Sequence, residues 1–595
     1  MKIQRQHHGL IAVCVIFAIS ILISKIPKNS ASTENIKKVH FTDATDLLDK
    51  KFIHKDNKLF YTSNLKTVYY RSLFFAPGIA VADFNKDGWQ DFIAVSSESG
   101  ANPQIYINDK GNKFINKNDD WGLNDGRLSD LKDTNISPFV YDYDNDGDLD
   151  LLVTNLTCNK YYENQGNKFL YVPEHRLNKE CHSSFSYLFY DLNEDSKTDI
   201  LELHYWYSRW AQEMFDYDGK GSFHGGPNSI FNALNGGRNA TLLSGEKRFH
   251  TLGYDNRWSF DAVVTDIDSD GKSELFVAND YSSDRIYQHR RDHVFYDVTR
   301  GYIFPDRRNG MSIASNYHPN DPYPYIYISN IYIKDYIEKG NFYWHYNEKT
   351  KSLEDHAIKS NVNDCRWAWG ASIADFNLDG YNDIYIANGY LSSNNGNSKA
   401  GNFRMASLSS LPFEDFVKKF PAVTQKSEKR IPFEFGENFS SVSGDQKDCL
   451  KLFDPNTNKF VDFSTEGTLD QAWDGRAVAT IDYDNDGDLD LLVTNQNNYL
   501  RLLKNTIEKN SNNNWIGFEI SNHHLIKKIT IYQGRNMYYK DWNSGRTGFL
   551  ATSDSRIHFG LIGSNPVKVI FEFTDARKVT KSSMELGKYH NLGKI

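Results

Sequence analysis

The chain has 595 residues, which is too long for one ordinary hydrophobic core and indicates several domains or a repeat architecture. Its formal net charge is −9, and it shows neither a basic balance nor a basic stripe, which argues against nucleic-acid binding. Aromatic residues make up 14% of the chain, as in β-rich proteins whose strands carry aromatic faces.

The N-terminus has the features of an export segment. Lys2 and Arg5 precede an apolar run, Leu10–Ser24. A basic start followed by such a run is typical of a secretory signal peptide, and the run is shorter than the ~20 residues that a membrane span needs. We expect residues 1–32 to be a cleaved signal peptide or an uncleaved N-terminal anchor, the protein's only contact with a membrane. The bulk of the chain is then secreted, periplasmic or at the cell surface.

Four cysteines follow this segment: Cys158, Cys181, Cys365 and Cys449. In an exported protein, four cysteines can form two disulfides. Three connectivities are possible, and the nearest-neighbour choice joins Cys158 to Cys181 and Cys365 to Cys449. Because no C-x-x-C motif is present, a zinc site or a thioredoxin-type site has little support.

One acidic stretch occurs twice, letter for letter. The sequence DYDNDGDLDLLVTN occupies residues 142–155 and again residues 482–495. Its apolar second half is typical of a buried strand, and short apolar runs precede most copies, so each unit is predicted to be strand, acidic loop, strand. We name the loops by their first residue, and variants of the acidic part give four more, namely loops 83, 191, 266 and 375 beside loops 142 and 482.

A second repeat, an aromatic residue followed by polar or acidic residues, lies between the loops. It has seven copies against six acidic loops, which predicts a seventh, altered unit between Val294 and Ser352. The segment from Gly310 has the flanking apolar runs of such a unit but lacks the acidic pattern.

The order of the repeats predicts a closed ring. The chain opens on the second repeat at Phe41, and the last unit ends without it after Asn505. If this repeat is the outer strand of a sheet, the first copy completes the last unit, and such an exchange closes a β-propeller. We predict an all-β fold, with a seven-bladed β-propeller over residues 33–510 and a small β-domain over residues 511–595.

The acidic loops offer the oxygen ligands that Ca²⁺ prefers. Side chains at positions 1, 3, 5 and 9 can converge on one cation, with the carbonyl of position 7 between them, and Gly at position 6 permits the bend. An EF-hand would need Glu at position 12, whereas Val153 stands there in loop 142. The predicted ligands are Asp83, Asn85, Asp87, Trp89 and Asp91; Asp142, Asp144, Asp146, Asp148 and Asp150; Asp191, Asn193, Asp195, Lys197 and Asp199; Asp266, Asp268, Asp270, Lys272 and Glu274; Asp375, Asn377, Asp379, Tyr381 and Asp383; and Asp482, Asp484, Asp486, Asp488 and Asp490.

A solvated acidic turn is the alternative for any single loop, because Asp, Asn and Gly favour turns. Six copies with the same offsets favour a cation, since clustered carboxylates repel one another unless a cation neutralises them. Loops 142 and 482, with four aspartates at ligand positions, should bind most tightly, and loop 191 most weakly because Ser196 replaces Gly. We expect about six Ca²⁺ sites with a structural role, and full oxygen shells leave no open position for catalysis.

The loops and strands resemble FG-GAP/VCBS repeats, the calcium-binding blades of integrin α-type propellers. The tail resembles the ASPIC/UnbV domain in RIHFGL from Arg556, VKVIFEF from Val567 and TDAR from Thr574, where the family usually has a Ser-Gly turn. It departs from that domain where FLATSD, from Phe549, replaces the S-x-Q stretch. The combination is similar to bacterial FG-GAP/ASPIC proteins and the cartilage acidic protein-like family. The resemblance implies an exported calcium-binding propeller with a small β-domain, and no defined activity.

Two insertions interrupt the repeats, at about residues 205–238 and 389–455. Long loops on a rigid scaffold often carry function, and exposed aromatic residues suit a sugar or peptide ligand. The candidate ligand-binding residues are Trp206, Trp210 and His224 in the first insertion. Equally, these loops could cap the propeller and bury their own aromatic side chains.

Three classes of function fit these observations. The first is a binding or adhesion module for an extracellular or cell-surface protein or polysaccharide. The second is a polysaccharide-active lyase or hydrolase built on a calcium propeller, and the third is a structural scaffold of a surface assembly. No nucleophile elbow, H-E-x-x-H, P-loop or G-x-G-x-x-G motif is present, so no catalytic residue is assigned.

Overall fold

The computed structural model is built almost entirely of β-strands. It describes residues 39–55, 77–98, 100–124, 134–144, 146–155, 158–179, 183–206, 229–234, 239–242, 258–280, 283–290, 294–304, 308–332, 339–389, 446–465, 467–469, 471, 473–496, 498–507, 513–542 and 547–595. Within these ranges, no helix is both long enough and apolar enough to cross a membrane. The predicted export segment, residues 1–32, lies outside them.

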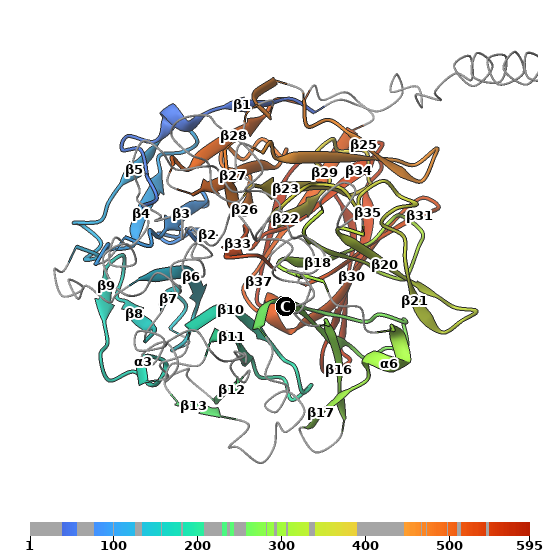
Figure 1. Ribbon diagram of the computed structural model, residues 1–595, viewed down its shortest axis with the longest axis horizontal. Helices are drawn as coiled ribbons and strands as arrows, with labels where there is room; N and C mark the ends of the chain where they lie inside the picture. The colour runs from blue at the N-terminus through green and yellow to red at the C-terminus, as the bar shows by residue number, and fades with distance from the viewer. Residues whose placement is uncertain are drawn as a thin grey trace, which may run out of the picture.

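Seven antiparallel units of four strands are present among the described residues, and Figure 1 shows them arranged around a central axis. The first six are, in chain order, β2 (Ile79–Ala82), β3 (Asp91–Ala94), β4 (Gln104–Asn108) and β5 (Phe114–Asn116); β6 (Asn135–Tyr141), β7 (Asp150–Asn155), β8 (Lys160–Asn164) and β9 (Phe169–Tyr171); β10 (Ser183–Tyr190), β11 (Asp199–Trp206), β12 (Ser229–Leu234) and β13 (Asn239–Leu242); β14 (Trp258–Thr265), β15 (Glu274–Asp280), β16 (Arg285–Arg290) and β17 (Val294–Asp297); β18 (Ile313–Asn316), β19 (Tyr325–Ile328), β20 (Phe342–Asn347) and β21 (Ser352–Asp355); and β22 (Ala368–Ala374), β23 (Asp383–Asn388), β24 (Cys449–Asp454) and β25 (Lys459–Asp462).

The last unit is completed from the other end of the chain. It consists of β26 (Gly475–Ile481), β27 (Asp490–Asn495), β28 (Arg501–Asn505) and β1 (Phe41–Asp43), with Phe41 paired to Asn505. The innermost strands contact one another in sequence, from β2 to β26, and β26 contacts β2 again. The all-β, propeller-like fold and the exchange of strands at Phe41 are therefore confirmed.

The repeated sequence forms equivalent structures in two units. Its apolar half is β7 in one copy and β27 in the other, and both strands are buried along their whole length. A neighbouring unit covers each face of these strands, so the apolar run is continuous instead of alternating with polar residues. Short helices occupy connections elsewhere: η2 (Thr45–Leu47), α3 (Arg176–Lys179), α6 (Thr299–Tyr302), η4 (Gly467–Leu469) and η5 (His523–Leu525).

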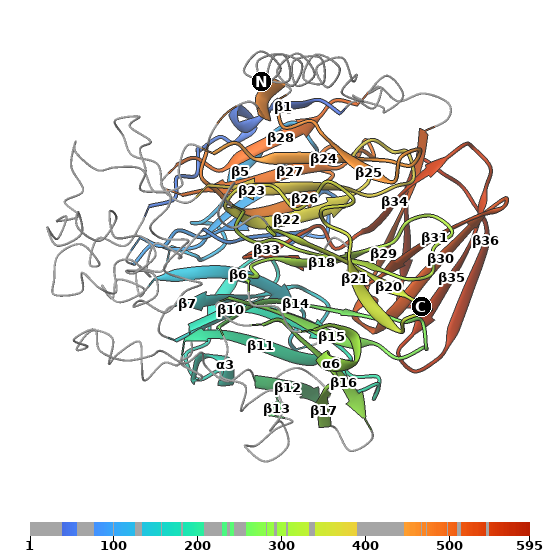
Figure 2. The same cartoon turned by 45° about the vertical axis from the view of Figure 1, so that its right-hand side comes forward.

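The C-terminal part forms two further sheets, which Figure 2 shows at one side of the ring. They share a continuous hydrophobic core with the third and fourth units; for example, the ring of Trp542 lies 5.9 Å from that of Tyr190. The strand orders are β34 (Ile557–Ile562), β29 (Asn513–Ile520), β37 (Tyr589–Gly593), and β31 (Asn536–Asp541), β30 (Ile526–Gln533), β35 (Val567–Phe573), β36 (Lys578–Met584).

A hairpin from this C-terminal part fills the centre of the ring. Its strands are β32 (Thr547–Gly548) and β33 (Ala551–Thr552), and β33 pairs in parallel with β2. β32 contacts β14, β18, β22 and β26, while β33 contacts β2, β6 and β26. We call residues 547–554 the central hairpin.

The tip of the central hairpin is the fully buried Phe549. Its ring lies 5.1 Å from that of Phe260 and 5.2 Å from that of Trp369. The amide of Phe549 donates a 3.1 Å hydrogen bond to Ser312 Oγ, and Leu550 O accepts one of 3.0 Å from the Ile79 amide. The tip of the hairpin is therefore held by apolar packing and by hydrogen bonds of its own main chain. These bonds reach Ser312, next to β18, and Ile79 in β2.

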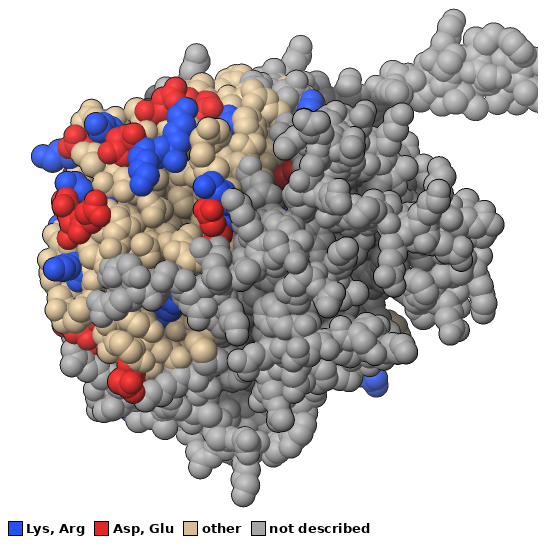
Figure 3. Space-filling view, turned by 60° about the vertical axis from the view of Figure 1, so that its left-hand side comes forward, with Lys and Arg blue, Asp and Glu red and all other residues tan. Residues whose placement is uncertain are grey.

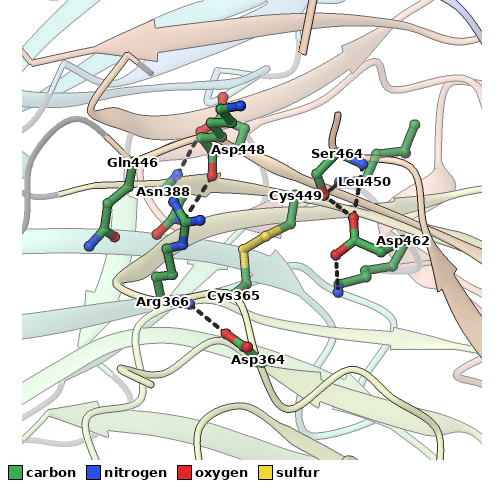
Figure 4. Close-up of a disulfide and its surroundings, with 12 residues drawn as sticks. Asp364, Cys365, Arg366, Asn388, Gln446, Asp448, Cys449, Leu450, Asp462 and Ser464 are labelled. Atoms are coloured by element: carbon green, nitrogen blue, oxygen red, sulfur yellow. Dashed lines mark hydrogen bonds and ion pairs between the residues drawn. A yellow bond between two sulfur atoms is a disulfide. The ribbon is translucent and has the colours of Figure 1, made fainter. Parts of the chain in front are cut away.

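A disulfide joins Cys365 to Cys449, as the nearest-neighbour pairing predicts. Figure 4 shows it linking the segment before β22 to the first residue of β24, which lies near the end of the second insertion. Cys158 is also disulfide-bonded, and Cys181, its predicted partner, lies outside the described residues.

Replacing Phe549 with Ala should remove the packing at the centre of the ring. A fully buried Phe→Ala change costs about 3–5 kcal/mol through lost burial and the cavity left behind, and urea unfolding followed by tryptophan fluorescence measures that loss. Phe304, which is 93% exposed, supplies the control, since Phe304→Ala should change stability by less than about 0.5 kcal/mol. Equal effects of the two substitutions would contradict the role of the central hairpin.

Candidate metal centre

The six acidic loops lie at the same place in six units. Each connects the innermost strand to the second strand, for example β2 to β3 in loop 83 and β26 to β27 in loop 482. Since the units repeat the same strand order around the ring, the six loops lie at one end of it. We call this the loop end.

The first carboxylate of each loop is held by the loop's own main chain. In loop 83, the Gly88 amide donates a 2.7 Å hydrogen bond to Asp83 Oδ2, and the Asp87 amide donates one of 3.1 Å to Asp83 Oδ1. Gly88 adopts φ +87°, the left-handed conformation that glycine tolerates best. The bond from position 6 to position 1 recurs from Gly147 to Asp142, Ser196 to Asp191, Gly271 to Asp266, Gly380 to Asp375 and Gly487 to Asp482.

The carboxylate at position 9 fastens the loop to the strands behind it. Asp91 Oδ2 accepts a 3.0 Å hydrogen bond from the Phe84 amide, and Asp91 Oδ1 accepts one of 2.7 Å from the Asn108 amide. The amide of position 2 makes the equivalent bond in every other loop: Tyr143 to Asp150, Leu192 to Asp199, Ile267 to Glu274, Phe376 to Asp383 and Tyr483 to Asp490.

Carboxylate oxygens converge in three loops, with one ligand atom from each of three residues within 4.8 Å of the others. In loops 83, 191 and 375, position 3 is asparagine, whose amide oxygen is also a calcium ligand. The converging groups are Asp142, Asp144 and Asp146; Asp266, Asp268 and Glu274; and Asp482, Asp484 and Asp490.

Burial makes these carboxylates costly to ionise without a cation. It raises the pKa of Asp150 and of Asp482 to about 7, that of Glu274 to about 8 and that of Asp199 to about 9. Neighbouring carboxylates of the same loop add to the shift of Asp199. A bound cation would remove both penalties, because it supplies the opposite charge that burial and repulsion leave uncompensated.

The donor set fits calcium. The loops present only oxygen ligands, on a turn that tolerates irregular geometry, which suits Ca²⁺ better than the strictly octahedral Mg²⁺. Asp199 is fully buried, and its Oδ1 atom accepts no hydrogen bond from the residues that the structure describes. A buried carboxylate oxygen at a predicted ligand position is consistent with a cation site in loop 191.

The unit without an acidic loop is the fifth, as predicted from the segment after Gly310. Its connection between β18 and β19 carries His318, Asn320 and Asp321 in place of the aspartate pattern. Asp321 Oδ2 lies 3.1 Å from His345 Nε2, and the His345 ring stacks on Tyr325 with a centroid distance of 4.0 Å. An aromatic cluster with a histidine–aspartate contact thus takes the place of the carboxylate cluster.

The sequence analysis missed the residues of the C-terminal sheets that contact the loops. Thr574 donates to Asp191, Tyr589 and Arg556 contact Asp482, and Lys527 contacts Gly271. These contacts join positions far apart in the chain and follow no spacing rule. A local signal was present only at Thr574, where TDAR replaces the Ser-Gly turn that is usual in the family. Of the predicted ligand-binding residues, Trp210 and His224 lie outside the described residues, and only the main chain of Trp206 is described, at the end of β11.

Comparison with known proteins identifies FG-GAP-like repeats in two places, at residues 83–153 and 142–202, which together contain loops 83, 142 and 191. No curated protein matches the chain. Among solved structures, it is similar to a protein assigned as a 6-phosphogluconolactonase from Bacteroides uniformis (12% identity, 48% of this chain and 70% of that chain, TM-score 0.27). It is also similar to BBS1N in complex with ARL6DN (10% identity, 73% of this chain and 93% of that chain, TM-score 0.37).

Removing calcium should reverse the usual pH dependence of stability. The carboxylates at position 9 bind protons more tightly in the folded state, so their contribution is present below about pH 4 and is lost as the pH rises through about 7 to 9. In EDTA, the melting temperature should fall between pH 5.5 and 8.5.

In calcium the same comparison should show no such fall, because the cation replaces the protons and binds better to ionised ligands. Magnesium serves as the control cation and should restore less stability than calcium. Identical pH profiles in EDTA and in calcium would show that the loops are solvated turns.

Replacing Ser196 with Gly should strengthen loop 191. Ser196 adopts φ +63° at position 6, a conformation that costs a residue with a side chain about 1 kcal/mol. The change should raise the free energy of unfolding in calcium by about 0.5–1 kcal/mol. The matched control is Gly88→Ser in loop 83, where an added Cβ would meet no atom within 4 Å, so that only the backbone effect remains. It should lower stability, and a gain in both variants would contradict this account.

Proposed function

We propose that the protein is an exported, calcium-stabilised, seven-bladed β-propeller that binds an extracellular or cell-surface partner, a protein or a polysaccharide. The observation that carries this proposal is the recurrence of one oxygen geometry in six loops at one end of a ring that contains FG-GAP-like repeats. FG-GAP-like repeats favour a propeller that acts as a binding or adhesion module. On sequence grounds, we also propose that residues 511–595 are an ASPIC/UnbV-like domain.

Calcium has a structural role in this proposal. Asp91 bonds the main-chain amide of Phe84 in its own loop and that of Asn108 in β4, so a cation held by the same carboxylate stabilises the attachment of the loop to its unit. Extracellular sites of this type bind calcium at roughly 0.1–1 mM. Each site then adds only about 0.4–1.4 kcal/mol at millimolar calcium, and six sites add several kcal/mol.

Export is supported by the cysteines. Cys365 and Cys449 are joined, and Cys158 is also disulfide-bonded. Disulfides form and persist in oxidising compartments such as the extracellular space and the periplasm.

The partner is proposed to bind at the end of the ring opposite the loop end. The central hairpin fills the middle of the ring, and the C-terminal sheets contact the loop end. The second strands β11 and β23 start at acidic loops and run away from them, so both insertions leave the ring at its opposite end. Figure 3 shows acidic and basic side chains interspersed over the described part of the side of the molecule that it presents.

The test is a binding screen with the full exported chain in calcium, against surface polysaccharides and extracellular proteins. A variant in which a short Gly/Ser linker replaces residues 390–445 should lose the partner and keep its calcium-dependent melting. The control is Arg535→Ala, an exposed residue of the C-terminal sheets whose neighbour Asn536 contacts Asn320 of the fifth unit, and it should bind normally.

Two results would overturn the proposal. Binding that is unchanged in the linker variant but lost in Arg535→Ala would place the partner at the loop end. Release of soluble oligosaccharides from a bound polysaccharide would show that the protein is an enzyme.

A further inference from the structure

The C-terminal sheets are seated on the acidic loops themselves. At loop 375, the main chain of Gly560 lies so close that an added Cβ would be 1.8 Å from Asp375 Oδ2. At loop 266, the Lys527 ammonium donates to the carbonyl oxygen of Gly271. The same lysine lies 3.4 Å from Glu194 of loop 191. One lysine therefore touches two neighbouring loops.

Loop 482 has the most extensive contact. Tyr589 donates a 2.8 Å hydrogen bond from its hydroxyl to Asp482 Oδ2, and Arg556 Nη2 donates one of 2.9 Å to Asp482 O. The indole of Trp515 covers Gly487, where an added Cβ would lie 1.8 Å from the ring. Asp482 is fully buried under these groups.

Loop 191 is contacted through a hydroxyl in the same way. Thr574 Oγ1 donates a 2.5 Å hydrogen bond to Asp191 Oδ2, which also accepts from the Ser196 amide. The Oδ1 atom of Asp199, a predicted cation ligand of the same loop, is also buried. Thr574 and Tyr589 therefore make equivalent contacts, each with the first carboxylate of a different loop.

We propose that loops 191 and 482 are composite cation sites. Thr574 and Tyr589 are positioning residues, which orient the first carboxylate of each loop, and a cation bound there fixes the C-terminal sheets to the ring. This inference rests on the calcium binding in the proposed function. It adds that calcium affinity and the docking of the C-terminal sheets depend on each other, because coupling between two binding events is reciprocal.

The fifth unit, which has no acidic loop, also contacts the C-terminal sheets, but through hydrogen bonds that need no cation. The Asn320 amide donates a 2.8 Å hydrogen bond to Met537 O, and the Met537 amide donates one of 2.9 Å to Asn320 Oδ1. Strand β31 of the C-terminal sheets thus docks directly on the connection that replaces the acidic loop. Direct hydrogen bonds to Asn320 hold the C-terminal sheets at this unit. The proposed cation sites of loops 191 and 482 hold them at the third and seventh units.

The test removes one hydroxyl at a time from the full exported chain. Tyr589→Phe and Thr574→Val should each weaken calcium binding at one site by about tenfold, as losses of partners behind metal ligands commonly do, measured by calorimetric titration with calcium alone. Hydrogen exchange should also become faster in β37 and in the central hairpin at a fixed, subsaturating calcium concentration. Tyr532→Phe and Thr580→Val, both at exposed positions of the same sheets, are the matched controls.

Each outcome decides one point. If the parent chain binds no calcium, both the proposed function and this inference fail. If it binds calcium but both variants match their controls in affinity and exchange, only the composite sites fail.

If a variant does not fold, the parent chain gives the answer by itself. Calcium removal with EDTA should then raise exchange in β37 and the central hairpin well before the outer strand β21 of the fifth unit. Uniform exchange throughout the chain would overturn the inference.

Discussion

The structure depends on carboxylates that are buried where two strands meet a turn. At position 9 of each acidic loop, a carboxylate accepts hydrogen bonds from main-chain amides, as Asp91 does from Phe84 and Asn108. These bonds fix the loop, but they also bring several negative charges together in a poorly hydrated place. Burial and mutual repulsion therefore raise the pKa of these carboxylates, as for Asp199, and the same kind of loop recurs in six of the seven units.

The C-terminal sheets pack directly against the ring. Their core is continuous with that of the third and fourth units, and their hairpin supplies Phe549 to the middle of the ring. Three kinds of contact act together: apolar packing inside the ring, hydroxyl contacts to loop carboxylates, and hydrogen bonds between Asn320 and the main chain of Met537. We infer that the two parts unfold as one cooperative unit, because separating them would expose a buried core and leave polar groups unpaired.

Much of the ring could be predicted from the sequence because the patterns that specify its loops and strands lie in short, continuous segments. Alternating aspartates followed by an apolar run give a loop and a buried strand, and the position of Phe41 gives the closure of the ring. The altered fifth unit followed from an unequal count of two repeats. The central hairpin could not be predicted in this way, because FLATSD mixes apolar and polar residues and is buried only by strands from distant units. The contacts of Thr574 and Tyr589 were hidden for the same reason: a hydroxyl beside a carboxylate leaves no periodic pattern.

The central hairpin also sets the order in which the protein can be completed. Ser137 donates a hydrogen bond to Leu550 O across a sequence separation of 413 residues. Contacts of this range form late, since closing so long a loop costs entropy before any packing repays it. A chain that crosses a membrane from its N-terminus would expose an open ring until its last residues emerge. The ring is completed only when residues 547–554 insert, so the insertion of the central hairpin is a late step of folding.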